Sequence, residues 1–298
     1  MKKTYKLFAT IVFIAFSILV SAQQDPEIIT APSSEIICTG DDVTYIVKAI
    51  GTEPFSYEWF FNGTAIPGND NDTLLIPGAD ETNEGTYYCV VSNTVSSDTT
   101  DEFQLLVVSG PPEIIGQTAD STYCEATYQQ ISITATGENL YYTWTHDENP
   151  ISFFCPNVTF NSLSGADDGT YTCTVNNACG IAGPVSIQVN VTLLPDIISL
   201  PEPVTVCEGD NTGFGVTAEG TGLQYQWFYE GIPLSGENTD TLIFTNVNAD
   251  TAGMVSCSIF NNCDSINTGQ VSLTVNTLPQ ITAQPIDHTM CIGEDITL

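Results

Sequence analysis

Positive charge is nearly absent from this 298-residue sequence, which has 36 acidic residues, four Lys and Arg residues and a formal net charge of −32. Nucleic acids and anionic membranes are bound mainly through clusters of Lys and Arg. After residue 22 the only basic residue is Lys48. The composition therefore excludes nucleic acid and anionic membrane surfaces as partners. An unknown protein or glycan ligand outside the cell remains.

Groups for catalysis are also scarce. The sequence has two histidines, and His146 lies in the polar run 146–149, which reads as a solvated turn. His288 is the other. No glycine-rich phosphate loop and no paired C-x-x-C zinc ligands occur. Carboxylates are concentrated in turns, and no cleft is indicated. The sequence predicts no enzyme and no catalytic residues.

No cofactor is predicted, and calcium is the one metal ion that the acidic turns suggest. Turns at 68–72 and 80–81 supply the oxygen ligands that this ion prefers. Neither turn has the spacing of an EF-hand. Solvated loops are the simpler interpretation of both.

Long hydrophobic runs are missing except at the start of the chain. Lys2, Lys3 and Lys6 precede the apolar stretch 7–20, and small residues at 20–22 form a cleavage site. The apolar stretch is shorter than the roughly 20 residues of a transmembrane helix. Residues 1–22 are therefore predicted to be a cleaved signal peptide, and the mature protein to be secreted or held at the outer cell surface.

Ten cysteines are present, and in an exported chain they indicate disulfides, because the compartments outside the cytoplasm are oxidising. They also mark a repeat. One cysteine recurs every 83 to 86 residues, a single Trp follows it, and a second cysteine comes later. The recurring residues are Cys38, Cys124, Cys207 and Cys291, then Trp59, Trp144 and Trp227, then Cys89, Cys173 and Cys257.

Each repeat contains alternating apolar residues, as in Tyr45, Val47 and Ala49, a pattern typical of a strand with one buried face. Asn62-Gly63 is a strong signal for a two-residue hairpin. No segment has helical periodicity. The predicted fold class is all-β, with tandem β-sandwiches. The predicted boundaries are a signal peptide at 1–22, domains at 23–109, 110–194 and 195–277, and the start of a truncated fourth domain at 278–298.

The segments 85–89 and 167–173 resemble the D-x-G-x-Y-x-C corner of immunoglobulin domains. The resemblance implies tandem immunoglobulin-like β-sandwich domains, like beads on a string, with Trp59, Trp144 and Trp227 as core aromatics. It also implies that the hydroxyls of Tyr87 and Tyr171 tie their corners to nearby backbone. The third repeat lacks both the Asp and the Tyr of this motif, so its corner is expected to be weaker.

A narrower resemblance comes from the run C-E-G-D with Y-x-W, T-L and N-x-C-G in tandem. These motifs look like the immunoglobulin-like repeats of large exported, adhesin-like and gliding-motility-associated proteins of the Bacteroidetes.

The sequence departs from immunoglobulin domains at the first core cysteine. Val47, Ile133 and Val216 occupy that second-strand position, so the usual inter-strand bond cannot form. The fold then implies that the cysteine just before the second strand is the partner, with a loop of about 50 residues worth roughly 4 kcal/mol. Buried free cysteines are the rival interpretation. The implied pairs are Cys38–Cys89, Cys124–Cys173 and Cys207–Cys257.

Four cysteines lie outside these pairs. The resemblance places Cys155 and Cys179 at the opposite end of the second domain, and implies the pair Cys155–Cys179. Cys263 has no partner inside its own repeat. It is either a free thiol or a bridge between repeats, because its hairpin faces the preceding domain. Cys291 is expected to pair beyond residue 298.

Two classes of function fit these features. The leading hypothesis is a non-enzymatic extracellular or cell-surface repeat protein that acts as a stalk or as an adhesion and binding module. The alternative is an accessory spacer or glycan-binding region of an exported hydrolase whose catalytic domain follows residue 298.

Overall fold

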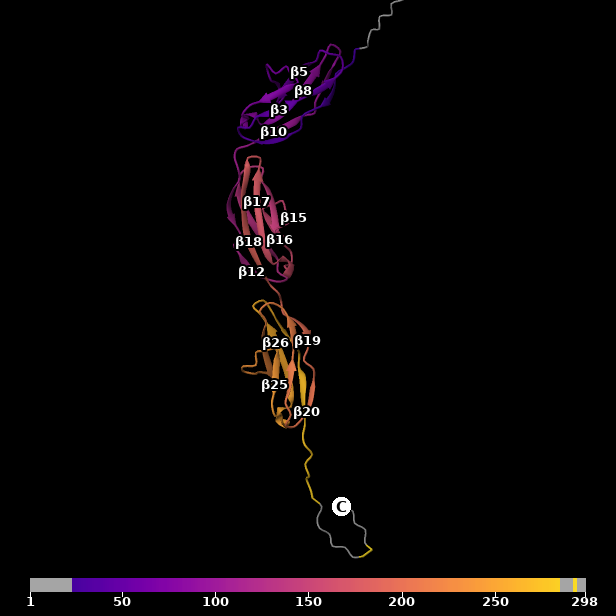
Figure 1. Ribbon diagram of the computed structural model, residues 1–298, viewed down its shortest axis with the longest axis vertical. Helices are drawn as coiled ribbons and strands as arrows, with labels where there is room; N and C mark the ends of the chain where they lie inside the picture. Colours follow the sequence, from indigo (N-terminus) through magenta and orange to yellow (C-terminus); the bar gives the residue numbers. More distant parts are fainter. Residues whose placement is uncertain (1–22, 285–291, 294–298) are drawn as a thin grey trace, which may run out of the picture. The chain divides into compact units, whose positions relative to one another are not determined.

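A computed structural model describes residues 23–284 and 292–293 of the chain. The predicted signal peptide, Cys291, His288 and most of the predicted fourth domain lie outside the described residues. The described chain is all-β, apart from three short 3-10 helices, and forms three successive sandwiches (Figure 1).

The chain divides into two compact units, and the division passes through the second sandwich. The first unit ends at Glu113 and also includes the segments Ala135–Tyr141 and Val175–Ala182. The second unit holds the rest of the second sandwich and the third sandwich.

The first sandwich packs a six-stranded sheet, in the order β2-β10-β8-β5-β6 with β9 beside β8, against the pairs β1-β4 and β3-β7. Its elements are β1 (Glu27–Thr30), β2 (Glu35–Cys38), β3 (Val43–Ile46), β4 (Lys48–Ile50), β5 (Ser56–Phe61), β6 (Thr64–Ala65), β7 (Thr73–Ile76), the 3-10 helix η1 (Glu81–Asn83), β8 (Gly85–Ser92), β9 (Ser97–Thr99) and β10 (Phe103–Val108).

The second sandwich has a three-stranded sheet, β11-β13-β16, and a five-stranded sheet, β12-β18-β17-β14-β15. Its elements are β11 (Glu113–Gln117), β12 (Ser121–Cys124), β13 (Gln129–Thr136), β14 (Tyr141–His146), β15 (Asn149–Ile151), β16 (Asn157–Phe160), η2 (Gly165–Asp167), β17 (Gly169–Asn177) and β18 (Gly180–Thr192).

The third sandwich repeats the plan of the first, with β20-β28-β26-β23-β24 and β27 in one sheet and the pairs β19-β22 and β21-β25 opposite. Its elements are β19 (Asp196–Ser199), β20 (Val204–Cys207), β21 (Thr212–Gly215), β22 (Thr217–Glu219), β23 (Gln224–Tyr229), β24 (Ile232–Pro233), β25 (Thr241–Phe244), η3 (Ala249–Thr251), β26 (Gly253–Phe260), β27 (Ser265–Asn267) and β28 (Val271–Asn276).

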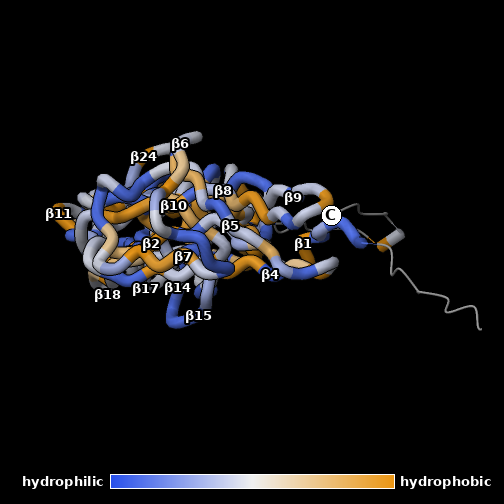
Figure 2. The backbone as a smooth tube through the Cα atoms, turned by 90° about the horizontal axis from the view of Figure 1, so that it is seen from above, coloured by the Kyte–Doolittle hydropathy of each residue, from blue (hydrophilic) through white to orange (hydrophobic). Residues whose placement is uncertain are grey.

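Alternation along the strands explains why these segments form sandwiches. Val43 and Tyr45 of β3 are buried, while the residues between and after them are exposed. In β8, the buried residues Tyr87, Cys89 and Val91 alternate with half-buried ones. Successive side chains of a strand point to opposite faces, so each sheet buries one face. Figure 2 shows hydrophobic segments running along the strands, whereas many connecting turns are hydrophilic.

A two-residue turn joins the strand that carries the core Trp to the next strand, as between β5 and β6 and between β23 and β24. Asn62 and Gly63 have φ values of 48° and 76°, and Glu230 and Gly231 have values of 50° and 75°. A positive φ at both central residues defines the hairpin turn that matches strand twist, and Asn and Gly adopt it most easily. The hairpin predicted at Asn62-Gly63 is confirmed, since Phe61 pairs with Thr64 across it.

The predicted fold class is confirmed, since every sheet is built from short strands and no α-helix occurs among the described residues. In each sandwich a short early strand also runs parallel to the last one, as β2 does beside β10. Within the described part of the chain, no helix is long and apolar enough to cross a membrane.

Candidate functional site

Disulfides join neighbouring sandwiches. Cys38, at the end of β2, is bonded to Cys179 in the hairpin between β17 and β18, with Cα atoms 4.6 Å apart and a sequence separation of 141. Cys124, at the end of β12, is bonded in the same way to Cys263 after β26, with Cα atoms 5.6 Å apart. Each bridge lies inside one compact unit. The same device therefore occurs twice, one repeat apart.

The predicted pair Cys38–Cys89 is wrong, and the strand register explains why. Cys38 pairs with Val108 of β10, whereas Leu105 of the same strand pairs with Gly85 at the start of β8. Cys89 lies further along β8 in the direction away from Cys38. The offset is about seven residues, or roughly 23 Å. A disulfide needs Cα atoms within about 7 Å.

The other two core pairs fail as well. Cys207 pairs with Asn276 of β28, while Leu273 pairs with Gly253, so Cys257 is offset from Cys207 as in the first sandwich. The predicted Cys207–Cys257 pair is therefore wrong. Cys124–Cys173 is also wrong, because Cys124 is bonded to Cys263 and Cys173 is a buried free thiol.

The predicted pair Cys155–Cys179 is contradicted too, since Cys179 is bonded to Cys38 and Cys155 is an exposed free thiol. The Cys155 sulfur lies 3.1 Å from the carbonyl oxygen of Asn157 in its own loop. Of the two alternatives for Cys263, the bridge between repeats is the correct one. Two bridges replace the four that were predicted.

The buried free cysteines act as small apolar core residues. Cys89, Cys173 and Cys257 have no exposed surface. Burial raises the pKa of Cys89 and of Cys257 to about 11 and that of Cys173 to about 12. Desolvation disfavours the charged thiolate, which is the reactive form. These thiols are therefore poorly suited to act as nucleophiles.

An asparagine fixes the hairpin that carries each bridging cysteine. The Asn177 Oδ1 atom accepts hydrogen bonds from the backbone N–H groups of Cys179 and Gly180, at 2.9 and 3.2 Å. The Asn177 Nδ2 atom donates to the carbonyl oxygens of Gly110, in the linker, and Glu138, at 2.8 and 3.2 Å. The Asn177 amide thus makes two hydrogen bonds inside the hairpin, one to the linker and one to the loop at Glu138.

The second joint has the same asparagine. Asn261 Oδ1 accepts from the N–H of Cys263 at 2.9 Å, and its Nδ2 donates to the carbonyls of Leu193 and Thr221 at 2.8 and 3.0 Å. Glu125 adds a further contact, since its Oε2 accepts from the N–H of Leu194 at 3.0 Å. The covalent bridge is therefore accompanied by a hydrogen-bonded linker.

The first sandwich keeps the asparagine but not the cysteine. Asn93 Nδ2 donates to the carbonyls of Gln24 and Thr52, at 2.8 and 3.0 Å. Val95 stands where the later hairpins have cysteine, and its N–H is bound to Asn93 Oδ1 at 2.9 Å. The asparagine thus belongs to the fold of every repeat, whereas the cysteine marks the repeats that are bridged to a preceding one.

The core tryptophans lie where the sequence pattern predicts. Trp59, Trp144 and Trp227 are at most 1% exposed. Each indole N–H donates to a backbone carbonyl in the loop that follows the next short strand. The acceptors are Asn71 at 2.9 Å, Cys155 at 3.0 Å and Thr239 at 2.9 Å. Each ring therefore fills a core and also fixes one loop.

The tyrosine corners form in the first two sandwiches. The Tyr87 hydroxyl donates to the Asn83 carbonyl at 2.7 Å, and the Tyr171 hydroxyl donates to the Asp167 carbonyl at 3.2 Å. Both rings are buried. These are the contacts to nearby backbone that the resemblance implied.

The third sandwich replaces the missing corner tyrosine with a tyrosine from another strand. Val255 occupies the position of Tyr87 and Tyr171. The Tyr229 hydroxyl, from β23, lies 3.2 Å from the carbonyl oxygen of Asp250 and 3.0 Å from that of Ala252. The sequence reasoning missed this substitution, although Tyr229 stands two residues after the core Trp, where the other repeats have Phe61 and His146.

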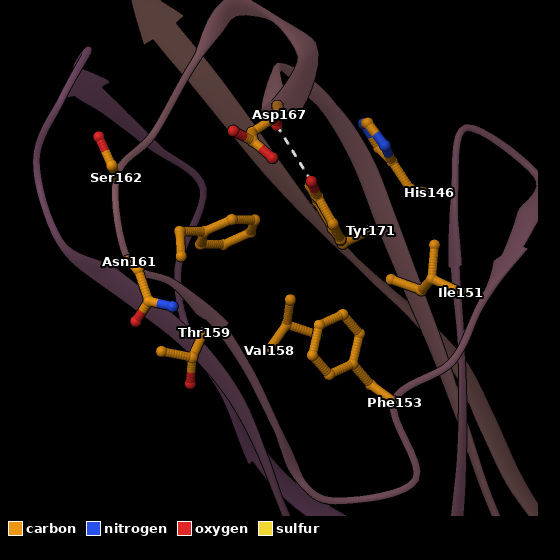
Figure 3. Close-up of a pocket in the computed structure, with 10 residues that line it drawn as sticks. His146, Ile151, Phe153, Val158, Thr159, Asn161, Ser162, Asp167 and Tyr171 are labelled. Atoms are coloured by element: carbon orange, nitrogen blue, oxygen red, sulfur yellow. Dashed lines mark hydrogen bonds between the residues drawn. The ribbon is translucent and has the colours of Figure 1, made fainter.

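A shallow hollow of about 430 Å³ lies beside the second tyrosine corner (Figure 3). The His146 ring stacks on Tyr171 with centroids 4.4 Å apart. The only carboxylate of the hollow is that of Asp167, and it accepts hydrogen bonds from the backbone and hydroxyl of Ser164, both at 2.8 Å. The lining is His146, Ile151, Phe153, Val158, Thr159, Phe160, Asn161, Ser162, Asp167 and Tyr171.

This hollow has no arrangement of groups suited to catalysis. His146 Nε2 lies 3.0 Å from the backbone oxygen of Asp168 and 3.7 Å from a carboxylate oxygen of Asp147. A similar hollow in the first sandwich is lined by Phe61, Leu74 and Tyr87, among others. Its recurrence beside a second corner indicates a feature of the fold.

The acidic turns are occupied by local structure. The Asp80 carboxylate accepts from the backbone N–H and the hydroxyl of Thr82, at 2.9 and 2.6 Å, and caps η1. The hydrogen bond from the Thr82 hydroxyl lowers the pKa of Asp80. Asp72 accepts from the Thr73 hydroxyl. In residues 23–284 and 292–293 no three His, Cys, Asp or Glu side chains come together in a group that could hold a metal ion.

The bridging pattern had a signal in the sequence. Both bridged hairpins have the sequence Asn-x-Cys, at 177–179 and 261–263. The first repeat has Val95 in place of the cysteine. Among the three described repeats, the hairpin cysteine thus occurs in the second and third, each of which is bridged to the repeat before it. That correlation favours a bond between repeats over one inside them.

Comparisons with known proteins agree with the sandwiches. Residues 25–93 match the family described as "Immunoglobulin domain". The solved structure of titin domains I67–I69, in an E-to-A mutated variant, has 23% sequence identity and a TM-score of 0.51, and the match covers 86% of this chain and all of that one. The fold is therefore that of tandem immunoglobulin-like domains.

Curated relatives of this chain are animal proteins. The "Peroxidasin homolog" of Mus musculus is 23% identical over 300 residues, which are 92% of this chain and 20% of that protein. The "Muscle M-line assembly protein unc-89" of Caenorhabditis elegans is 23% identical over 302 residues, 88% of this chain and 4% of that protein. The "Cell adhesion molecule DSCAM" of Gallus gallus is 27% identical over 182 residues, 50% of this chain and 9% of that protein. The chain spans a fifth or less of the length of these relatives.

Proposed function

We propose that this chain is a non-enzymatic structural or adhesive module that works outside the cytoplasm, and that disulfides between its repeats hold the joints. The observation that carries the proposal is the pair of equivalent bridges, Cys38–Cys179 and Cys124–Cys263. A bond inside a domain stabilises that domain alone. A bond from one repeat to the next instead limits how far the two can separate.

The two bridges close overlapping loops. One loop runs from 38 to 179 and the other from 124 to 263, so every residue from 38 to 263 belongs to at least one of them. Pulling the chain by its ends loads the shortest covalent path. That path from residue 23 to residue 277 has about 85 residues, against about 255 in the reduced chain. The bridges thus limit the extension of the chain even when a sandwich unfolds.

Composition and comparisons support the same role. Relatives include proteins named for cell adhesion and for muscle assembly. Disulfides persist in oxidising compartments, which supports secretion or display at the outer cell surface after loss of residues 1–22. The partner we propose is a protein or glycan outside the cell, since the charge of −32 disfavours nucleic acid and anionic membranes. We further propose domains at 23–109, 110–194 and 195–277, in a bacterial surface protein of the adhesin-like kind described above.

Stretching single molecules tests the mechanical part of this proposal. Tethers at residues 23 and 277 should extend to about 300 Å under oxidising conditions and to about 870 Å after reduction, at roughly 3.4 Å per residue. The matched control carries Cys38→Ser and Cys124→Ser, and it should extend fully without reductant. Equal extension of the oxidised chain and the control would refute covalent linkage of the repeats.

A separate assay tests the non-enzymatic part. Residues 23–277 incubated with polysaccharide and peptide substrates should show no hydrolysis. Activity that disappears on substituting specific carboxylates would instead identify the chain as part of a hydrolase.

A further inference from the structure

Cys207 occupies the same place in the third sandwich as the two bonded cysteines in the sandwiches before it. It ends β20 and pairs with Asn276 of the last strand. Cys38 pairs in the same parallel register with Val108, and Cys124 with Thr192. Yet Cys207 is an exposed free thiol.

The turn after the cysteine is also the same in all three sandwiches. The N–H of the following residue donates to the carbonyl of the paired residue of the last strand, at 2.9 Å each time. These bonds are Thr39 to Val108, Glu125 to Thr192, and Glu208 to Asn276. The next residue has a positive φ, namely 92° at Gly40, 62° at Ala126 and 95° at Gly209. The backbone therefore presents Cys207 as it presents the bonded cysteines.

The linker after the third sandwich repeats the second joint. Glu125 accepts from the N–H of Leu194, and Glu208 stands in its place directly after Cys207. Leu278 follows Asn276 at the same distance as Leu194 follows Thr192, and a proline comes next in both linkers. One half of a bridged joint is thus complete at this end of the third sandwich.

We propose that Cys207 forms a third bridge, to the cysteine of an Asn-x-Cys hairpin in an immunoglobulin-like unit that follows the third sandwich. The inference deepens the proposed function and rests on it. A second copy of the described chain is disfavoured as the partner, because both of its hairpin cysteines, Cys179 and Cys263, are already bonded. A following unit would have no such limit, and Leu278-Pro279 repeats the Leu-Pro of the linker between the second and third sandwiches.

The bond forms by thiol–disulfide exchange with a small-molecule disulfide such as oxidised glutathione. The Cys207 thiolate attacks one sulfur of the oxidant, which gives a mixed disulfide and one released thiol. The hairpin thiolate then attacks the Cys207 sulfur and releases the second thiol. The two cysteines lose two protons and two electrons in all, and the oxidant takes up both.

A tandem fusion built from the chain itself tests the proposal. Residues 1–279 are joined to a second copy of residues 196–277 in which the duplicate of Cys207 is changed to Ser, so that the original Cys207 is the only thiol of its kind. The fusion keeps the linker register and supplies a hairpin equivalent to the one at Cys263. Non-reducing peptide mapping should find Cys207 bonded to the hairpin cysteine of the appended copy. In the parent chain Cys207 should react with iodoacetamide, and in the fusion this labelling should fall at least tenfold.

Two variants keep the result interpretable. Replacing the appended hairpin cysteine by Val, the residue that the first repeat has at Val95, should restore labelling of Cys207 in the fusion. Cys207→Ser should leave the other two bridges intact. Labelling of Cys207 in a fusion whose appended copy is protease-resistant would overturn the inference, as would a Cys207–Cys207 dimer of the fusion. Loss of the Cys38 and Cys124 bridges as well would point to failure of the proposed function instead.

Discussion

The first and third sandwiches have the same sheet order but differ at the corner and at both ends. The first has a corner tyrosine, Tyr87, and a hairpin without cysteine, and its Cys38 is bonded. The third takes its corner hydroxyl from Tyr229, and its hairpin cysteine is bonded, while Cys207 is free. The comparison shows that the tyrosine of the corner can come from either of two strands. The cysteines at the ends of a sandwich, in contrast, differ between the first and the third.

The interior exchange has a simple physical basis. A corner needs a tyrosine hydroxyl that reaches the carbonyls around the 3-10 helix, and either strand at that corner can supply the ring. The ends of the sandwiches are different, because a cysteine there can form a bridge only with a cysteine of a neighbouring repeat. Four predictions test this contrast.

The largest expected effect comes from removing the disulfide between the second and third sandwiches, Cys124–Cys263. Cys124→Ser combined with Cys263→Val should lower the free energy of unfolding of the third sandwich by about 2–4 kcal/mol, because the closed loop constrains the unfolded chain. Hydrogen exchange of the β26 amides measures the change. The wild type in reductant should match the variant, and Cys207→Ser should not differ from the wild type. Equal protection with and without the bridge would contradict the assignment of Cys263.

The corner hydroxyls should come next. Tyr87→Phe should destabilise the first sandwich by about 1–2 kcal/mol, because the half-buried Asn83 carbonyl loses its donor. Tyr229→Phe should destabilise the third by about 1 kcal/mol, because water can reach the two exposed carbonyls that lose theirs. Urea unfolding of the two variants measures the loss. Tyr88→Phe, on the same strand as Tyr87 but outside the corner, is the matched control and should be nearly neutral. A neutral Tyr229→Phe would show that the third corner does not depend on this hydroxyl.

Smaller losses are expected from the unbonded core cysteines. Cys89→Ala and Cys257→Ala should each lower the free energy of unfolding by about 0.5–1 kcal/mol, because each leaves a small cavity beside a core Trp. The cost should be equal with and without reductant. Unfolding curves in both conditions test this. A loss of stability that appears only under oxidising conditions would support the disulfides Cys38–Cys89 and Cys207–Cys257.

The smallest signal is expected from alkylation of the three buried free cysteines, Cys89, Cys173 and Cys257. Their pKa values, about 11 for Cys89 and Cys257 and about 12 for Cys173, are higher than that of an ordinary thiol. At pH 8 the thiolate fraction is therefore on the order of one in a thousand or less. Mass spectrometry should find these three cysteines unlabelled in the folded protein, with Cys155 labelled as the exposed control. Labelling of Cys89 at the rate of Cys155 would mean that the core is open.

Much of the fold could be predicted from local signals. The alternation at Tyr45 and Val47 identified a half-buried strand, Asn62-Gly63 identified a hairpin, and the single Trp of each repeat identified its core. These features depend on side-chain periodicity and on the backbone preferences of individual residues. Both can be read within a short window of sequence.

The partner of each cysteine could not be predicted in this way. Cys38 and Cys89 are the only cysteines of the first repeat, and the immunoglobulin resemblance implied that the cysteine before the second strand is the partner of the later one. The register of β2, β10 and β8 separates them by about seven residues along the sheet. The corner role of Tyr229 could not be predicted for a similar reason. It depends on a contact with the carbonyls of Asp250 and Ala252, more than 20 residues away in sequence.

The sequence by itself determined the repeat, the strands, the buried tryptophans and the nearly complete absence of positive charge, because each follows from the residue types and their spacing. The tertiary structure alone decided which sulfur atoms meet. A disulfide requires two Cα atoms within a few ångströms, and that distance is set by strand register and by the hydrogen bonds that hold each bridging hairpin to its linker.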